Sequence, residues 1–224
     1  MDLTMFEKMQ QLPLFQGMTR FEMSEIIERV KLNFCQNKAG EIFAEQGERC
    51  DRLIYVLRGK FTAEYLHAED KYSMTEVMDG PSLIEPYNIY GLNQEYSRTY
   101  KFVTDGSTFV IDKLAFKNFL MNYDIVKANM LNIICTRCQN ISKRLWLSNN
   151  GDIESKILKF LKIHSLQPNG EKRLKIKMED LARLMGESRI NVSRALNAMQ
   201  DRGIAELKRK EIIIFDIEKA TEGI

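Results

Sequence analysis

The spacing of apolar residues changes twice along the chain, and each change predicts a different kind of structure. Residues 3–31 repeat apolar side chains at helical spacing, which indicates short helices. Residues 32–111 instead hold short β-type runs, such as 53–57 and 109–111, separated by recurring glycines. Such runs are typical of a meander or barrel of antiparallel strands, so we expect a β-rich domain of about 80 residues.

After Asp112 the apolar spacing is helical again, and a long helix is predicted from Asp124 to about Leu147. Its apolar positions follow one another in steps of three and four, as in a coiled-coil seam, and are Leu131, Ile134, Cys138, Ile141 and Leu145. This seam either pairs with the same seam of a second copy or packs on the chain's own β domain. We favour the homodimer, because it suits the DNA-binding motif described next.

Residues 148–151, Ser-Asn-Asn-Gly, predict a break in the chain and a hinge that includes Asp152. Asp152 is also a suitable N-cap for a helix over 153–165, and the alternation over 173–177 predicts a short strand. The chain is therefore expected to divide into an effector domain at 1–123, a dimerisation helix at 124–147 and a DNA-binding domain at 148–224.

Residues 178–196 carry the strongest motif, that of a helix-turn-helix. Two closely crossing helices need a small residue between them, and Ala182 supplies it. The tight turn needs a residue that tolerates positive φ, and Gly186 stands four positions later. Val192 is the apolar residue that locks the second helix onto the first, and Ser188 is a favourable N-cap. These requirements, met in one window, predict a DNA-binding domain.

The second helix and the hairpin predicted after it carry polar groups suited to DNA. In the major groove, arginine pairs with guanine edges and asparagine with adenine edges, and both residue types lie in the first turn of this helix. Residues 204–207 and 211–215 predict two strands joined by a basic tip, a wing suited to phosphate contact. The candidate DNA-binding residues are Ser188, Arg189, Asn191, Ser193, Arg194, Lys208, Arg209 and Lys210.

Composition narrows the class of protein. Hydrophobic residues make up 44% and charged residues 29%, as in ordinary globular proteins. No stretch reaches the roughly 18 apolar residues of a membrane span, and no signal peptide is recognisable, so we expect a cytoplasmic protein without membrane contact. The net charge is only +2, but the positive excess lies in the C-terminal third, in agreement with DNA as partner.

Metal and redox chemistry are weaker interpretations. Cys135 and Cys138 stand at the spacing of a metal or redox pair, but Cys138 also fits the apolar seam, so we expect buried structural thiols. A reducing compartment would keep all four cysteines as thiols. His67 and His164 have no partner at ligand spacing. No metal site is therefore expected.

Catalysis is not expected either. The chain offers no nucleophile–base pair, no carboxylate pair in a catalytic context and no phosphate-binding glycine loop. A group of tyrosines either lines an aromatic ligand pocket or packs inside the β domain, and we favour packing. They are Tyr87, Tyr90, Tyr96 and Tyr100.

With these motifs assembled, the chain resembles the Crp/Fnr superfamily, which includes the catabolite activator, over nearly its whole length. Residues 12–18 are similar to the family's N-terminal motif, and residues 39–47 and 53–59 to its first β-roll hairpins. The resemblance implies an α+β protein: a double-stranded β-helix, or jelly roll, of the cyclic-nucleotide-binding type, then a long dimerisation helix and a winged helix-turn-helix. It also implies a transcription regulator that binds palindromic promoter DNA as a homodimer, contacts RNA polymerase, and responds to an effector in the β-roll.

The effector cassette departs from the family pattern. Members that bind cyclic AMP hold its ribose with a Gly-Glu pair and neutralise its phosphate with an arginine some ten residues later. Here an isoleucine precedes Glu85, Glu95 stands where the arginine is expected, and Arg98 lies three residues further on. We therefore expect either an unidentified small-molecule effector or none, and not a cyclic nucleotide. Including the family's polar pair on the dimer helix, the candidate effector residues are Glu85, Arg98, Thr99, Ile141 and Ser142.

The recognition helix departs from the family at one position. Arg189 and Arg194 match the family's arginines, whereas Ile190 replaces the glutamate between them. Isoleucine cannot accept a hydrogen bond from cytosine and suits a thymine methyl, so Ile190 joins the DNA-binding candidates and predicts a different operator.

The rival hypothesis is a ligand-sensing regulatory subunit that controls an enzyme or other protein, and salt-insensitive binding would favour it.

Overall fold

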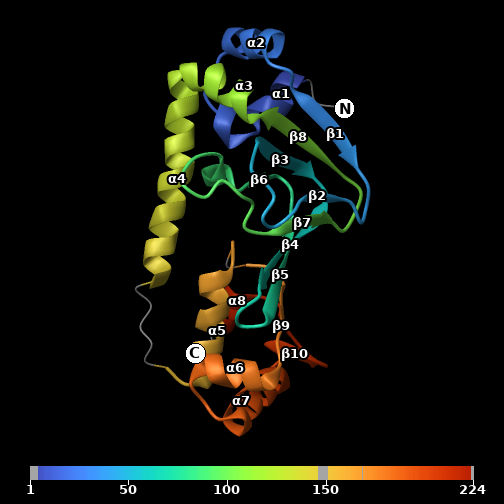
Figure 1. Ribbon diagram of the computed structural model, residues 1–224, viewed down its shortest axis with the longest axis vertical. Coiled ribbons are helices and arrows are strands. Elements are labelled where there is room, and N and C mark those ends of the chain that lie inside the picture. Colours follow the sequence, from blue (N-terminus) through green and yellow to red (C-terminus); the bar gives the residue numbers. More distant parts are fainter. Residues whose placement is uncertain (1–4, 146–150, 168, 223–224) are drawn as a thin grey trace. The chain divides into compact units, whose positions relative to one another are not determined.

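The computed structural model describes residues 5–145, 151–167 and 169–222, which form two compact units (Figure 1). The first unit holds the chain up to Phe61, then Asp79–Ser97 and Lys101–Asn140. The second holds Thr62–Met78, Arg98–Tyr100 and the chain from Ile141 onward. The described part of the second unit therefore combines the C-terminal residues with a hairpin from the middle of the β-rich segment.

The first unit contains helices and an antiparallel sheet. Its helices are α1 (Met5–Gln10), η1 (Pro13–Phe15), α2 (Arg20–Arg29), η2 (Pro86–Ile89), α3 (Lys113–Asn118), η3 (Leu120–Asn122) and most of α4 (Asp124–Leu145). Its strands include β1 (Asn33–Asn37), β2 (Ile42–Ala44), β3 (Arg52–Arg58), β6 (Ser82–Ile84) and β8 (Gly106–Asp112). Four of these strands form a sheet in the order β1-β8-β3-β6.

Aromatic side chains form the core beneath this sheet. The ring of Phe109 lies 6.2 Å from that of Phe15 and 6.4 Å from that of Tyr55, and all three side chains are buried. The Tyr55 hydroxyl accepts a hydrogen bond from the backbone N–H of Leu14 at 3.1 Å, so this buried phenol is paired. Burial raises the pKa of Tyr55. The N-terminal segment is thereby fixed to the sheet.

Helix α2 begins where its sequence provides a capping box. The backbone N–H of Glu22 donates to the Thr19 hydroxyl at 3.2 Å, and the Thr19 N–H donates to the Glu22 carboxylate at 2.8 Å. The hydrogen bond from the Thr19 backbone lowers the pKa of Glu22. Met23, Ile26 and Val30 then point into the core, as their helical spacing predicts.

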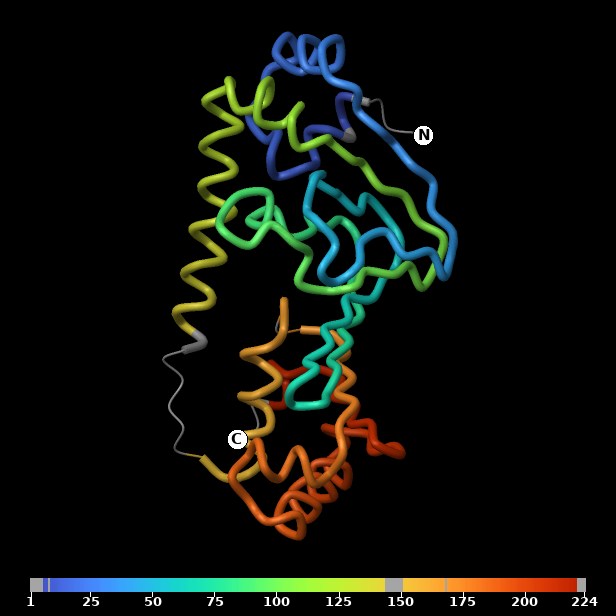
Figure 2. Tube along the Cα trace, viewed as in Figure 1, coloured from blue at the N-terminus to red at the C-terminus, as the bar shows by residue number. Residues whose placement is uncertain are grey.

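The second unit is built around a mixed core of helices and strands. Its helices are α5 (Ile153–His164), α6 (Met178–Met185), α7 (Arg189–Asp201) and α8 (Ile217–Glu222). Its strands include β5 (Tyr72–Asp79), β9 (Lys172–Lys175), β10 (Ala205–Lys208), β11 (Glu211–Ile214) and most of β4 (Lys60–His67), while β7 (Thr99–Phe102) begins in it. Here the strands are neighbours in the order β10-β11-β9-β5-β4. The path of the β4–β5 hairpin can be followed in Figure 2.

The α+β prediction is confirmed, with a β-roll, a long helix and a winged helix-turn-helix in chain order. Helix α5 starts after Asp152, whose carboxylate accepts the N–H of Ser155 at 2.9 Å, so this predicted N-cap is confirmed. That hydrogen bond lowers the pKa of Asp152. The expected hinge residues Ser148–Asn150 lie outside the described residues. Within the described residues, no helix has the length and apolarity needed to cross a membrane.

Candidate DNA-binding surface

Helices α6 and α7 meet in the tight turn that the motif predicts. Gly186 has φ +67°, and its N–H donates to the carbonyl of Arg183 at 3.2 Å. The N–H of Glu187 donates to the carbonyl of Ala182 at 3.0 Å, so two of the last four carbonyls of α6 have donors in the turn. Ala182 is buried where the helices cross. The glycine is required by its backbone conformation and not by crowding, since no atom lies near its missing Cβ.

Helix α7 has one buried face and one free polar face. Val192, Leu196 and Met199 are buried in the core of the second unit. Ser188, Arg189, Asn191 and Arg194 are exposed, Ile190 is 64% exposed, and Ser193 is half-buried. The structure therefore places every predicted recognition residue outside the core, and most of them lie at the N-terminal end of α7.

The cap of α7 gives a stability prediction. The Ser188 hydroxyl accepts the N–H of Asn191 at 3.2 Å. Ser188→Ala is expected to destabilise the protein by about 1 kcal/mol, because an N-terminal donor of the helix loses its acceptor. Ser188→Gly is the matched control, since glycine at an N-cap costs only a few tenths of a kcal/mol. Urea unfolding followed by circular dichroism measures the difference, and equal losses for both variants would contradict the capping role.

The predicted wing is present as the hairpin β10–β11. Lys208 pairs with Glu211 at its end, so Arg209 and Lys210 form a two-residue turn, with Lys210 at φ +62°. Lys208, Arg209 and Lys210 are all exposed. The ammonium of Lys208 lies 3.2 Å from the carboxylate of Glu206, a surface pair worth little in water. Three cations therefore project from one turn of chain.

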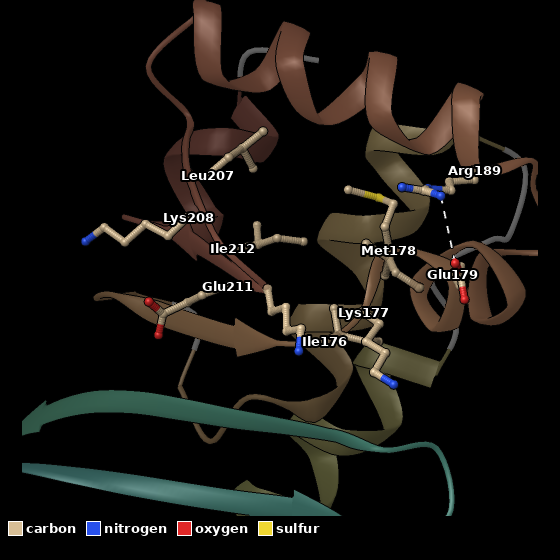
Figure 3. A pocket seen from close by; sticks show the side chains of 11 residues that line it. Ile176, Lys177, Met178, Glu179, Arg189, Leu207, Lys208, Glu211 and Ile212 are labelled. Atoms are coloured by element: carbon tan, nitrogen blue, oxygen red, sulfur yellow. Dashed lines mark ion pairs between the residues drawn. The ribbon is translucent and has the colours of Figure 1, made fainter.

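A cavity of about 310 Å³ lies between the start of α6, the start of α7 and the wing (Figure 3). Four basic residues line it, namely Lys177, Arg189, Lys208 and Lys210, together with the acidic Glu179 and Glu211 and apolar residues that include Ile212. Lys177 occupies the N-cap position of α6 and no side chain caps this helix. Sequence analysis placed Lys177 at the end of a strand and missed this basic contribution, although the absence of a capping side chain before α6 is visible in the sequence.

Among the residues that the structure describes, Arg189 has one ion-pair partner. Its guanidinium lies 3.8 Å from the carboxylate of Glu179, and the two side chains are 69% and 77% exposed. An ion pair at this distance and exposure is weak, so Arg189 is available for a stronger bidentate partner.

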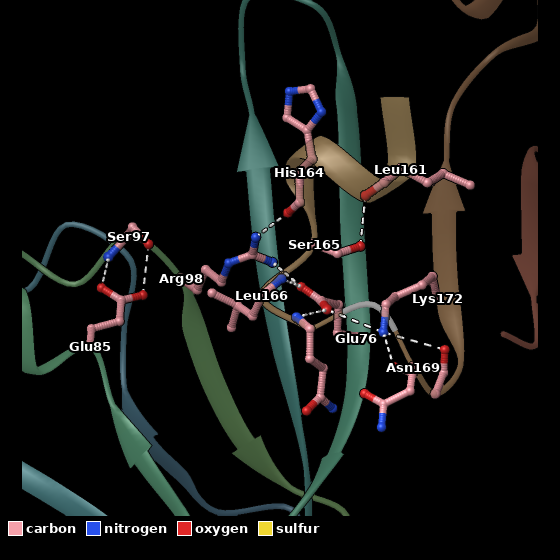
Figure 4. A network of polar contacts seen from close by, with 12 residues as sticks. Glu76, Glu85, Ser97, Arg98, Leu161, His164, Ser165, Leu166, Asn169 and Lys172 are labelled. Carbon is pink, nitrogen blue, oxygen red and sulfur yellow. Dashed lines mark hydrogen bonds and ion pairs between the residues drawn. The ribbon is translucent and has the colours of Figure 1, made fainter. Parts of the chain in front are cut away.

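A buried ion network attaches the β4–β5 hairpin to the winged helix within the second unit (Figure 4). The Glu76 carboxylate lies 3.0 Å from the guanidinium of Arg98 and 3.3 Å from the ammonium of Lys172. It also accepts the backbone N–H of Leu166 at 2.7 Å. Glu76 and Lys172 are fully buried, and burial lowers the pKa of Lys172. Glu76 on β5 also lies opposite Lys172 on β9 in an antiparallel strand pair, so backbone pairing and the ion network join the same two strands.

Two of the candidate effector residues, Glu85 and Arg98, are already engaged within the protein. The Glu85 carboxylate accepts the N–H and the hydroxyl of Ser97 at 2.8 and 2.7 Å (Figure 4). It also accepts a hydrogen bond from the side-chain amide of Asn88. It is only 3% exposed. Arg98 pairs with Glu76 as described, while Thr99 is half-buried. On α4, Ile141 is 45% exposed and Ser142 is exposed.

The tyrosines and histidines have structural partners. Tyr96 and Tyr100 are buried, and Cζ of Arg137 lies over the Tyr87 ring, 4.4 Å from its centroid. These positions agree with packing inside the β domain. The ring of His67 stacks on Tyr72 at 5.2 Å. Nδ1 of His164 lies 2.8 Å from the carbonyl of Phe160.

The dimerisation candidates lie along α4. Leu131 is 61% exposed and Ile134 is half-buried, while the side chain of Leu145 lies outside the described ones. Cys135 and Cys138 are free and exposed in the single chain, so these thiols are not buried within their own unit, and their burial in a dimer stays a prediction. The reason is that α4 packs on its own unit through a different face, which includes the buried Val126 and Met130.

Comparisons with known proteins agree with this architecture. Residues 155–219 match the family model of the Crp-like helix-turn-helix domain. The chain is 22% identical, over 80% of its length and 81% of the relative, to the CRP-like cAMP-activated global transcriptional regulator of Mycobacterium tuberculosis. Its fold is similar to that of the Thermus thermophilus catabolite activator protein, with TM-score 0.54, 20% identity and coverage of 94% and 97%. A regulator from Eubacterium rectale with a Crp/Fnr family assignment gives TM-score 0.52, 21% identity and the same coverage.

Proposed function

Because this chain is a DNA-binding transcription regulator of the Crp/Fnr type, we propose that it recognises a two-fold-symmetric promoter site as a homodimer. The observation that carries the proposal is the free face of α7 beside a tripositive wing. Two recognition helices about 34 Å apart reach successive major grooves on one side of DNA.

Base recognition is assigned to the first turns of α7. Arg189 and Arg194 suit guanine because a guanidinium offers two donors to the two acceptors of the guanine edge. Asn191 suits adenine because its side-chain amide offers one donor and one acceptor. Ile190 is 64% exposed, and its apolar side chain suits a thymine methyl. We therefore expect an operator that differs from those of family members with a glutamate at this position.

Phosphate binding is assigned to the wing and its surroundings. Lys208, Arg209 and Lys210 are exposed cations on the wing and not on the recognition helix, so we assign them to phosphates. The hydroxyls of Ser188 and Ser193 are further donors for phosphate oxygens. The first residues of α6, which no side chain caps, line the same cavity as Lys177. A phosphate there would be bound by helix N–H groups and lysine together.

Two substitutions separate base recognition from phosphate binding. Arg189→Ala is expected to cost about 1–3 kcal/mol of DNA-binding free energy and to relax the preference at one base step. Arg209→Ala is expected to weaken binding to all sequences alike and to lower the slope of log affinity against log salt by about one. Titration of labelled duplexes at several salt concentrations measures both effects. A changed base preference in the Arg209 variant would contradict its phosphate role.

Dimerisation is assigned to α4, through Leu131, Ile134, Cys138, Ile141 and Leu145. The exposure of Leu131 and Ile141 in the single chain supports this, because large apolar side chains on a helix favour burial against a partner. We retain the division into an effector domain at 1–123, the helix at 124–147 and a DNA-binding domain at 148–224 as part of the proposal.

The effector is proposed to be a small molecule other than cyclic AMP, or to be absent. The Glu85 carboxylate already holds Ser97 and Asn88, and Arg98 already holds Glu76, so the groups that a cyclic nucleotide would need have partners in the chain. The exposed Glu95 would also repel a phosphate placed near it. Contact with RNA polymerase and a cytoplasmic location complete the proposal.

Selection of bound sequences from random duplexes, with and without cyclic AMP, tests this function. A two-fold-symmetric site enriched in both conditions is the expected result. Enrichment only with cyclic AMP would overturn the effector proposal and leave the DNA-binding proposal standing. No enrichment, together with binding that does not depend on salt, would favour the regulatory subunit of another protein.

A further inference from the structure

Two thiols lie on the face of α4 that is turned away from its own unit. Val126 and Met130 are buried against that unit, and the side-chain amide of Asn129 donates to the carbonyl of Leu14 at 3.0 Å. Cys135 and Cys138 are free and exposed. At 100° per residue they fall on the opposite side of the helix, beside Leu131.

The spacing of the two thiols matches a metal-binding half-site. Residues three apart on a helix have Cβ atoms about 5–6 Å apart, so two Sγ atoms can approach further and share one ion. Cys-x-x-Cys is a common spacing for half of a tetrahedral four-thiolate site, with Zn–S distances of about 2.3 Å. Within the described residues of one chain, no cluster of three metal-ligating side chains exists. A complete four-thiolate site would therefore need two thiols from another molecule.

We propose that Cys135 and Cys138 of two chains form a four-thiolate site for a thiophilic divalent metal ion on the two-fold axis of the dimer. The inference rests on the proposed dimerisation through α4. In a dimer with helix axes about 8–10 Å apart, the four side chains meet in the space between the helices. Each chain alone supplies too few ligands, so the ion binds only the dimer.

The charge of α4 supports a thiolate–metal centre in preference to neutral thiols. From Asp124 to Leu145 the helix carries four basic residues, Lys127, Arg137, Lys143 and Arg144, and one acidic residue, Asp124, which pairs with Lys127 at 2.8 Å. Two such helices placed side by side repel each other. A divalent ion with four thiolates carries a net charge of −2, which offsets part of this repulsion at the place where the helices meet.

Binding requires no oxidant or reductant. Four thiols lose four protons to solvent, four sulfur–metal bonds form, and the ion keeps its +2 state, so the product is the tetrathiolate complex with charge −2. Zinc is the natural probe because it has no redox chemistry at this site and favours tetrahedral sulfur ligands.

The test uses the full chain, reduced and stripped of metal with a chelator. Equilibrium dialysis against Zn²⁺ with elemental analysis is expected to give one ion per two chains and the release of about four protons per ion. Co²⁺ in place of Zn²⁺ is expected to give the visible absorption of tetrahedral thiolate coordination. Sedimentation is expected to show dimers about tenfold tighter or more with saturating Zn²⁺, because the ion binds only the dimer.

Matched variants identify the ligands. Cys135→Ser and Cys138→Ser are each expected to abolish stoichiometric binding and the Co²⁺ spectrum. Cys35→Ser, which removes another exposed thiol on strand β1, is expected to change neither. Unchanged circular dichroism in the variants shows that loss of metal does not reflect unfolding.

Other outcomes overturn the site and can be told apart from failure of the proposed function. A metal-free dimer that binds symmetric DNA but takes up no Zn²⁺ overturns the metal site and leaves the proposed function standing. A chain that stays monomeric with Zn²⁺ overturns the site together with the proposed dimer. Binding of one ion per chain also overturns the shared metal site. A covalent dimer induced by diamide, without metal binding, overturns the site in favour of a redox pair.

Discussion

The Glu76→Gln variant is expected to lose about 3–5 kcal/mol of folding free energy, because it removes the charge of the carboxylate that pairs with two buried cations. The guanidinium of Arg98 and the ammonium of Lys172 lie 3.0 and 3.3 Å from the Glu76 carboxylate, at a fully buried position. Glutamine keeps the shape of glutamate and removes only its charge. Urea unfolding followed by circular dichroism measures the loss.

Glu206→Gln provides the surface control for this experiment. Glu206 and Lys208 are about half exposed, so their pair is expected to contribute at most about 1 kcal/mol. Adding Lys172→Met to Glu76→Gln is expected to recover part of the loss, since the methionine leaves no unpaired ammonium. Strict additivity of the two changes would contradict coupling through the ion pair.

The loss is also expected to shrink as pH rises. Burial lowers the pKa of Lys172 in the folded protein. Between that lowered pKa and the ordinary value of 10.5, the unfolded state binds more protons, so this group's contribution to stability increases with pH. Without Glu76 the pKa of Lys172 falls further, and the neutral amine is tolerated at lower pH. A Glu76→Gln penalty that grows with pH would contradict this account.

The Leu131→Glu variant is expected to lower affinity for a full two-fold-symmetric site by about 10²–10⁴-fold while the chain stays folded. Leu131 is 61% exposed in the single chain, so a charge there does not disturb the core. In the dimer the two glutamates would face each other and lose hydration. Two separate monomers would then bind the two half-sites independently, and the gain in affinity from linking the two recognition helices would be lost.

Leu114→Glu is the matched control for dimerisation. Leu114 lies on α3 and is 66% exposed, so the two substitutions introduce the same charge at comparable exposure. Sedimentation and titration of a full site and a half-site are compared for both variants. The proposal expects only Leu131→Glu to become monomeric and to lose the preference for the full site. Equal effects of the two variants would contradict dimerisation through α4.

The helix-turn-helix was predictable because its requirements are local. Gly186 is needed for a single positive φ, Ser188 for a hydrogen bond three residues away, and Val192 for contact with a neighbouring helix. Each property depends on residues within about one helical turn or one helix crossing. The wing was predictable for the same reason, since its strands are joined by a two-residue turn.

The role of Arg98 was not predictable, because its partners are distant in the sequence. It was considered as an effector ligand, whereas in the structure its guanidinium pairs with Glu76, 22 positions earlier, and donates to the carbonyl of His164. Pairing of β5 with β9 brings residues 73–76 beside 172–175, and no turn or periodicity encodes this register. Tertiary pairing alone gave Glu76 and Lys172 their burial.

The exposure of Cys135 and Cys138 shows the same limit on one helix. Periodicity identified an apolar seam through Cys138, and it predicted the helix correctly. It did not show which face α4 turns toward its own unit, because a helix with apolar residues on two sides can pack through either. The burial of Val126 and Met130 decides the matter.

The sequence by itself thus determined the order of a β-roll, a long helix and a winged helix-turn-helix, including helix α7 and the β10–β11 hairpin that we propose to contact DNA. Only the tertiary structure decided which polar groups are already satisfied, such as Glu85 by Ser97 and Glu76 by Lys172, and which face of α4 is free. The physical reason is range: caps, turns and periodic faces arise from neighbours in the chain, whereas burial and ion pairing depend on segments that meet only after folding.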